Sequence, residues 1–305
     1  MTSSNLFGPG DPAEPPGPGQ GRLGRPLGPI VAGCPAEHRA WLELVREAYL
    51  ESGLTMTVLS GRVHMARSKI SELMSGRRYP HWELLLTIAA ELRLPAGPLY
   101  RLWRQAAPEI RRKSRAWSAE TAATVAVQYS PPLHHNGFRD LTESGYRFYA
   151  GVFLTDPART AAVDETYDQL WLAWAKALSS PDIRRHGWGV LRTSVMSRAP
   201  HIDNCPHFLH TAFDTLALHN LSGLEHAQAA SEQLAETQDL FRAMSRLPAP
   251  QLDVIVLRFL GGMTEEEVSD LLGVPLAAVR SDERHATRFL ENVLCPPPDT
   301  EGTLS

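Results

Sequence analysis

Apolar residues recur at intervals of three and four from Ala36 to about Cys295, and this helical periodicity restricts the fold class more than any other property of the chain. One such stripe consists of Trp41, Leu44, Val45 and Ala48, and another of Trp82, Leu85, Leu86, Ala89 and Leu92. No segment shows the alternation of apolar and polar residues that is typical of a half-buried strand. The sequence therefore predicts an all-α protein.

Interruptions of the periodicity divide the chain into modules. Residues 1–35 contain eight prolines and eight glycines, too many for a packed core, and residues 128–136 (QYSPPLHHN) form a second break. We expect the following parts: a disordered arm 1–35, a helical domain 36–117, a linker 118–140, a small helical bundle 141–200, a helical connector 201–240, a second helical module 241–295 and a disordered tail 296–305.

The charges are unevenly distributed, although the net charge is only -4. Residues 36–117 carry 14 basic and 8 acidic side chains, whereas residues 231–305 carry 6 basic and 13 acidic ones. A basic module of this kind is typical of nucleic-acid binding. The chain has no apolar run that would span a bilayer, no signal-peptide pattern and no C-x-x-C pair among its three cysteines. These features predict a cytoplasmic protein without membrane association.

Residues 55–76 (TMTVLSGRVHMARSKISELMSG) have the pattern of a helix-turn-helix. Two short helices locked at a fixed angle need apolar residues at particular offsets. These offsets are occupied by Leu59 and Val63 in the first helix and by Ile70 and Leu73 in the second. A generic helical hairpin with solvated arginines is the alternative, and the basic excess favours DNA binding over it.

The second of these helices leaves a polar face for the major groove. Its candidate contact residues are Arg67, Ser68, Lys69, Ser71 and Glu72, and Arg77 and Arg78 follow as candidate phosphate contacts. At Thr55, Leu59, Val63, Ile70 and Gly76 the segment resembles the lambdoid-repressor, or XRE-type, helix-turn-helix family over about 60 residues. The resemblance implies that Arg67, Ser68 and Glu72 read bases and that Lys69 contacts a phosphate.

Residues 246–290 contain a second helix-turn-helix pattern. Thr264 and Glu267 form a capping box at the start of a short helix, and Gly273 takes the turn that follows it. Before this short helix, one face of a predicted helix carries Leu252, Ile255, Val256 and Phe259. The core positions predicted for the two later helices are Val268, Leu271, Leu272, Val279, Ala286 and Leu290. Through LRFLGGMTEEEVSDLLGVP and VRS the segment is similar to region 4 of the sigma-70 family, which implies promoter binding by its last helix.

The last helix carries both signs of charge. Its candidate DNA contacts are Arg280, Ser281, Arg284 and Arg288. Asp282 and Glu283 lie among them, and a carboxylate that faces phosphates repels them. A protein-docking or purely structural helix is therefore the alternative to a promoter-binding one.

The central segment GYRFYAGVFLTDPARTAAVDETYDQLWLAWAKAL resembles region 2 of the smaller sigma factors, which implies docking on core RNA polymerase. One predicted helix carries the apolar stripe Val163, Tyr167, Leu170, Trp171, Trp174 and Leu178. Asp164, Glu165 and Asp168 are expected on the opposite, exposed face, as an acidic surface for a basic partner. Packing of an ordinary bundle is the alternative.

No sequence pattern points to catalysis or to a cofactor. G-x-S-x-G, Walker and strand-linked G-x-G-x-x-G motifs are missing from the sequence, and the His/Cys cluster HIDNCPHFLH (201–210) lacks a second cluster at metal-site spacing. The sequence therefore predicts a transcription regulator that binds double-stranded DNA and docks on RNA polymerase. The alternatives are a dimeric repressor without polymerase contact and a sigma-like or anti-sigma-like interaction protein that binds no DNA. A metal-dependent enzyme ranks behind these.

Overall fold

The structure is a computed structural model that describes residues 27–110, 130–209 and 227–294. Within these ranges it is built of helices, and strands occur only in the two-residue pair β1 (His201–Ile202) and β2 (Cys205–Pro206). This confirms the all-α class. The hairpin was not predicted, because its turn depends on two consecutive left-handed residues, Asp203 and Asn204, and not on an apolar pattern.

The N-terminal helices form one unit, called the head (residues 27–110). It contains α1 (Ala36–Glu51), α2 (Met56–Arg62), α3 (Arg67–Met74), α4 (Trp82–Glu91) and α5 (Ala96–Ile110). Its core is rich in aromatic residues: Trp41, Trp82 and Trp103 are at most 1% exposed. Burying such large side chains supplies much of the hydrophobic stabilisation of a small helical unit.

The remaining helices form the body (residues 130–209 and 227–294). Its first part contains α7 (Leu133–Phe153), α8 (Ala158–Leu172), α9 (Trp174–Ser179) and α10 (Ile183–Met196). Its second part contains α12 (Ala227–Met244), α13 (Ala249–Ile255), the π-helical turn η1 (Val256–Leu260), α14 (Glu265–Leu272) and α15 (Leu276–Leu294). Both parts contribute to a single hydrophobic core, which joins Tyr149 and Leu191 to Val256 and Val268.

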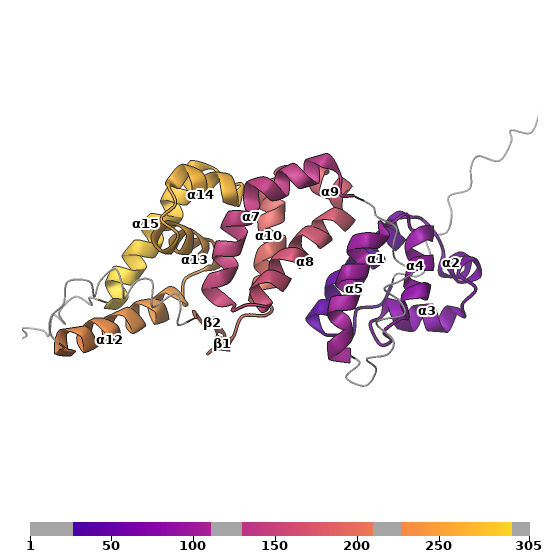
Figure 1. Ribbon diagram of the computed structural model, residues 1–305, viewed down its shortest axis with the longest axis horizontal. Helices are drawn as coiled ribbons and strands as arrows, with labels where there is room; N and C mark the ends of the chain where they lie inside the picture. The colour runs from indigo at the N-terminus through magenta and orange to yellow at the C-terminus, as the bar shows by residue number, and fades with distance from the viewer. Residues whose placement is uncertain (1–26, 111–129, 210–226, 295–305) are drawn as a thin grey trace, which may run out of the picture.

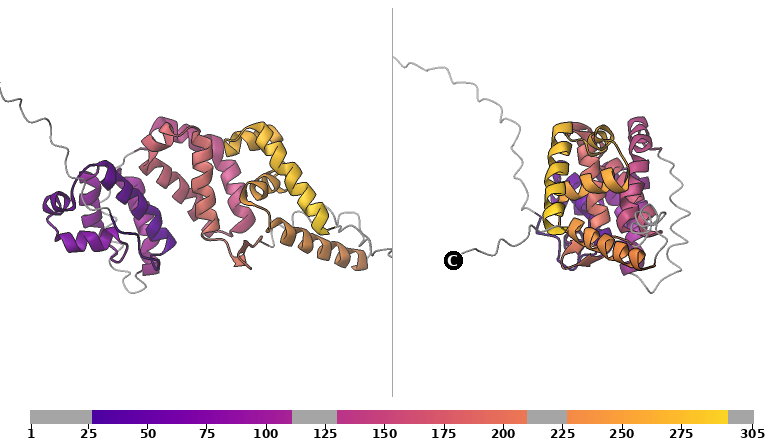
Figure 2. Two further views of the ribbon diagram at one scale, coloured as in Figure 1. Left: turned by 180° about the vertical axis from the view of Figure 1, so that it is seen from behind. Right: turned by 90° about the vertical axis from the view of Figure 1, so that its left-hand side faces the viewer.

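Figures 1 and 2 show the units in a row along the long axis of the molecule. The head lies at one end, α7, α8 and α10 lie in the middle, and α12 to α15 lie at the other end. The two helix-turn-helix segments are thus placed toward opposite ends. None of the described helices is long and apolar enough to cross a membrane.

Two expected boundaries differ from the structure. Residues 27–35 were assigned to the arm, but Cys34 is buried in the head and the Val31 amide donates to the Ser75 carbonyl at 3.0 Å. The linker was expected to reach residue 140, but α7 begins at Leu133 and buries Phe138. The rest of the predicted arm and the predicted tail 296–305 lie outside the described residues.

Candidate nucleic-acid interface

The α2–α3 segment is held by the four apolar residues expected from the sequence. Leu59, Ile70 and Leu73 are completely buried and Val63 is 7% exposed. The Thr55 hydroxyl caps α2 by accepting from the Val58 amide at 3.3 Å. These predictions are confirmed, and the buried positions determine which side of α3 is left for a ligand.

The side of α3 opposite this core is open to solvent. Its exposed residues are Arg67, Ser68, Lys69, Ser71 and Glu72, followed by Arg77 and Arg78. Arg78 lies 4.0 Å from the Glu72 carboxylate, whereas Arg67 and Arg77 form no ion pair among the described residues. All the residues proposed to contact DNA through this helix are therefore accessible to solvent.

An N-terminal strap (residues 27–35) fixes the end of α3, a role that the sequence did not indicate. The Arg46 guanidinium donates to the Gly28 carbonyl at 2.7 Å and also to the Met74 carbonyl, so it joins the strap to α3 through α1. Gly76 adopts φ 75°, and a Cβ at this position would lie 3.0 Å from Cys34 Sγ. A glycine here allows both the turn and the close approach of the strap.

The C-terminal helix-turn-helix forms as the sequence predicts. Thr264 Oγ1 accepts from the Glu267 amide at 3.2 Å, and Glu267 Oε2 accepts from the Thr264 amide at 2.8 Å. Gly273 follows in the left-handed conformation with φ 63°. The predicted core positions are buried, with two exceptions: Leu290 is half-buried, and Phe259 is 58% exposed. The expected apolar face of the first helix therefore does not extend to Phe259, which lies in the π-helical turn η1.

The outer face of α15 carries Arg280, Arg284 and Arg288, which are spaced by four residues and exposed. Arg280 is paired with Glu265, at 2.6 Å between Nε and Oε2. Glu283 was expected to repel phosphates, but its Oε2 lies 3.1 Å from Nε of Arg258 on η1, which partly neutralises it. Asp282 and Ser281 are half-buried, and burial raises the pKa of the Asp282 carboxyl. Arg284 and Arg288 thus remain unpaired cations on this surface of the described chain.

The expectation of an exposed acidic face on the central helix was wrong for two of its three residues. Glu165 and Asp168 on α8 are only 4% and 7% exposed, and Asp164 is half-buried at 3.1 Å from Arg139. Glu165 pairs with Arg198 of α10, and Asp168 pairs with Arg101 of the head. Burial raises the pKa of Asp168 to about 6, although the Arg101 guanidinium opposes this shift. The stripe itself divides at Ala173 into α8 and α9, and Leu178 is exposed.

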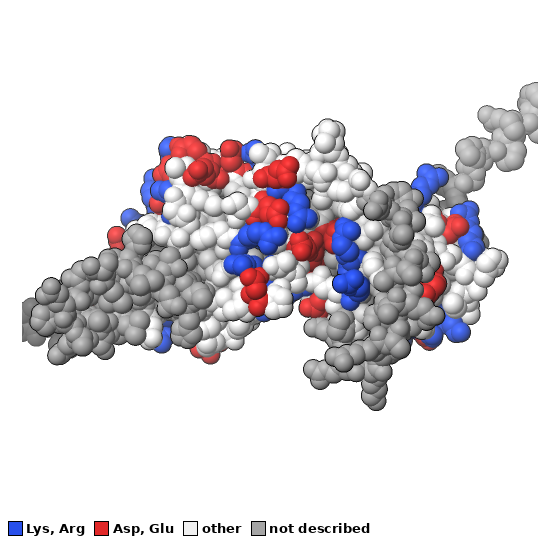
Figure 3. All heavy atoms as spheres, viewed as in Figure 1, with Lys and Arg blue, Asp and Glu red and all other residues white. Residues whose placement is uncertain are grey.

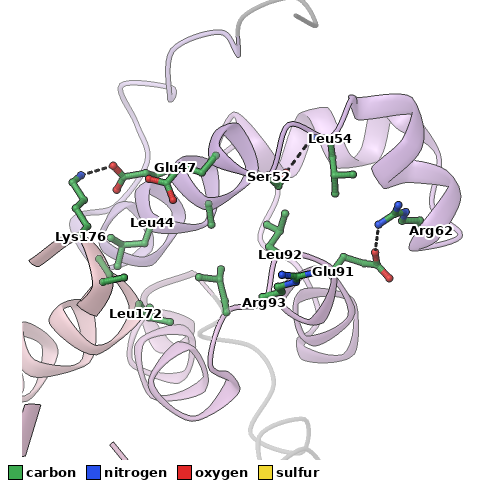
Figure 4. A pocket seen from close by; sticks show the side chains of 15 residues that line it. Leu44, Glu47, Ser52, Leu54, Arg62, Glu91, Leu92, Arg93, Leu172 and Lys176 are labelled. Atoms are coloured by element: carbon green, nitrogen blue, oxygen red, sulfur yellow. Dashed lines mark hydrogen bonds and ion pairs between the residues drawn. The ribbon is translucent and has the colours of Figure 1, made fainter. Parts of the chain in front are cut away.

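The α8 helix is buried on several sides because the head packs against it. Leu172 belongs to the hydrophobic core of the head, and Lys176 pairs with Glu47 of α1 (Figure 4). A cleft of about 560 Å³ opens beside these residues, between α1 and α4 of the head and the end of α8. Figure 3 shows basic and acidic side chains gathered over the middle of the molecule, where the head meets the body.

A buried polar network joins the two parts of the body. Both carboxylate oxygens of Asp253 on α13 accept from Nε of Arg192 at 3.1 Å. The Tyr149 hydroxyl donates to the same carboxylate at 2.6 Å, and the Trp188 indole donates at 2.8 Å. Burial raises the pKa of Asp253, opposed first by Arg192. The two parts of the body are consequently held together by specific hydrogen bonds as well as by apolar contacts.

Comparison with known proteins identifies one part of the chain. The family model for sigma-70, region 4 matches residues 237–287, from the end of α12 into α15. No curated protein and no solved structure matches the chain. The C-terminal helix-turn-helix is therefore similar to region 4 of sigma-70 factors. This similarity indicates a DNA-binding domain of the kind found in sigma-like transcription regulators.

Proposed function

We propose that this protein is a sequence-specific transcription regulator whose head reads double-stranded DNA through α3 and whose sigma-like body contacts core RNA polymerase. The observation that carries this proposal is the open polar face of α3, backed by a fully buried apolar side. Such an arrangement lets a few side chains meet base edges while neighbouring arginines hold phosphates. The resemblance of residues 55–76 to XRE-type regulators supports the same role.

The similarity of residues 237–287 to sigma-70 region 4 supports a second contact with the transcription machinery. We propose that Arg284 and Arg288 on α15 approach DNA phosphates and that the body binds polymerase. Recruitment then follows from proximity: a chain bound at its DNA site raises the effective concentration of polymerase at the adjacent promoter. This role requires no catalytic residue and no cofactor.

Footprinting of the full-length chain with and without core RNA polymerase tests the proposal. We expect protection of a defined DNA site by the chain alone and an extended protected region when polymerase is added. If polymerase does not extend the protected region, the result would favour a repressor. Sedimentation would then establish whether that repressor is a dimer. Absence of site-specific protection would favour an interaction protein that binds no DNA.

A further inference from the structure

The contact between head and body is built around one guanidinium. Nε of Arg101 on α5 lies 3.0 Å from both carboxylate oxygens of Asp168 on α8. The same guanidinium lies over the Trp171 ring, with its central carbon 5.3 Å from the ring centroid. A bidentate ion pair combined with stacking on an aromatic ring is the pattern by which arginines recognise partner surfaces.

Other polar links also cross this contact, beside the apolar packing of Leu172 in the core of the head. Arg198 of α10, which pairs with Glu165 within the body, lies 3.8 Å from Glu37 of the head, and Lys176 pairs with Glu47 of the head. The Gln105 amide approaches the Ala161 carbonyl at 3.4 Å. Ion pairs of this kind are sensitive to salt and to competing charges, in contrast to the aromatic core of each unit.

The contact is incompletely sealed. Its buried apolar side chains include Trp171 and Leu172, each 8% exposed, and Gly97 lies close to the Trp171 ring. The side chains of Arg101 and Lys176 are each 53% exposed, and the cleft of about 560 Å³ opens beside Leu172 (Figure 4). Interfaces between units of one chain that are polar and partly hydrated commonly permit relative motion of the units.

From these observations, and resting on the proposed polymerase contact, we infer that the head occupies a docking surface on α8 for an arginine-bearing helix of RNA polymerase. The surface consists of Asp168, Trp171 and Leu172, the residues of α8 that contact the head, and is called the α8 patch. In the closed chain, Arg101 of α5 fills this patch. When the head leaves it, the Asp168 carboxylate and the Trp171 ring become available to a partner of the same chemistry, whereas Glu165 keeps its pair with Arg198 of α10.

The closed arrangement leaves DNA reading unobstructed. The polar side chains of α3 are exposed while α5 is docked on α8. The head can therefore bind its DNA site in either state, and competition at the α8 patch changes only the affinity for polymerase. The apparent affinity of a partner for a surface that is mostly covered falls in proportion to the open fraction.

The charge-reversal variant Arg101→Glu tests this inference in the full-length chain. Arg104→Glu is the matched control, because Arg104 is the next arginine of α5, is exposed and forms no ion pair among the described residues. We expect Arg101→Glu to increase the radius of gyration in X-ray scattering and to bind core RNA polymerase about tenfold more tightly than the wild type. Arg104→Glu should change neither quantity, and both variants should bind the DNA site within about twofold of the wild type.

Each of the other results is decisive. An expanded Arg101→Glu chain with unchanged polymerase affinity would overturn the inference and leave the proposed polymerase contact intact. If the single variant is not expanded, Arg101→Glu combined with Glu47→Arg reverses two of the links, and a chain that stays compact then also overturns it. Absence of polymerase binding by the wild type and by both variants would instead refute the proposed polymerase contact.

Discussion

The indole nitrogen of Trp188 on α10 lies 2.8 Å from Oδ2 of Asp253 on α13, so that a buried hydrogen bond joins two segments 65 residues apart in the sequence. Arg192 and Tyr149 also donate hydrogen bonds to the same carboxylate. A carboxylate this deeply buried is tolerated because every partner around it is a donor.

Replacement of Asp253 by alanine should strongly destabilise the body. The substitution leaves the Arg192 guanidinium, the Trp188 indole and the Tyr149 hydroxyl without their shared acceptor, and removal of one partner of a buried pair typically costs about 3–5 kcal/mol. Chemical unfolding of the full-length chain measures this loss. Asp270→Ala, which removes an exposed pair with Arg184, should lower the free energy of unfolding by at most about 1 kcal/mol. Equal effects of the two substitutions would contradict this role for the network.

The head should become less stable as the pH falls below neutrality. Burial lowers the pKa of His38 to about 4 from its ordinary value of 6.5. The unfolded chain therefore takes up a proton near pH 6.5, while the folded chain keeps His38 neutral down to about pH 4. The contribution of neutral His38 to the free energy of unfolding is fully present above pH 6.5 and is lost as the pH falls from 6.5 toward 4. At pH 5 the loss is about 2 kcal/mol.

His38→Phe should remove this pH dependence. The ring packs against Trp41 and Tyr79, and Nε2 has no hydrogen-bond partner among the described residues, so phenylalanine preserves the contacts of the ring. Unfolding of the head, followed by tryptophan fluorescence at pH 7 and at pH 5, gives the difference in the free energy of unfolding between the two pH values. The exposed His134→Phe is the control and should keep the wild-type dependence. A His38→Phe variant that loses as much stability at pH 5 as the wild type would show that another group titrates.

If α15 approaches DNA, its unpaired arginines should contribute to the salt dependence of binding. Arg284→Ala together with Arg288→Ala removes two cations, and each phosphate contact contributes about 0.9 to the slope of log affinity against log salt. We therefore expect the slope for the full-length chain on a promoter fragment to fall by nearly 2. Arg242→Ala, on the exposed face of α12, should leave the slope unchanged. An unaltered slope in the double variant would assign α15 to a protein contact or to a structural role.

Features set by residues close in sequence were predictable. The capping box of Thr264 and Glu267 and the left-handed turn at Gly273 each depend on a few neighbouring residues, and both occur in the structure. Likewise, the offsets of Ile70 and Leu73 correctly indicated which side of α3 is buried. The polar face of the candidate DNA interface follows directly from that assignment.

Long-range partners were not predictable. An amphipathic pattern identifies the most apolar side of a helix, but it does not indicate whether a second unit covers the polar side. Asp168 is buried because Arg101, 67 residues earlier, lies on a head helix that packs against α8. Similarly, Glu283 is paired with Arg258 of η1, a contact across 25 residues that no local pattern records.

Base preference is the property that tests the central claim most directly. Selection of bound sequences from a randomised DNA pool should yield a defined site for the wild type, and Arg67→Ala with Ser68→Ala should lose preference at one or two base positions, equivalent to about 1–3 kcal/mol. Arg77→Ala should weaken binding evenly across sequences and retain the same preferred site. A double variant that selects the same site with the same preference at every position as the wild type would contradict DNA reading by α3.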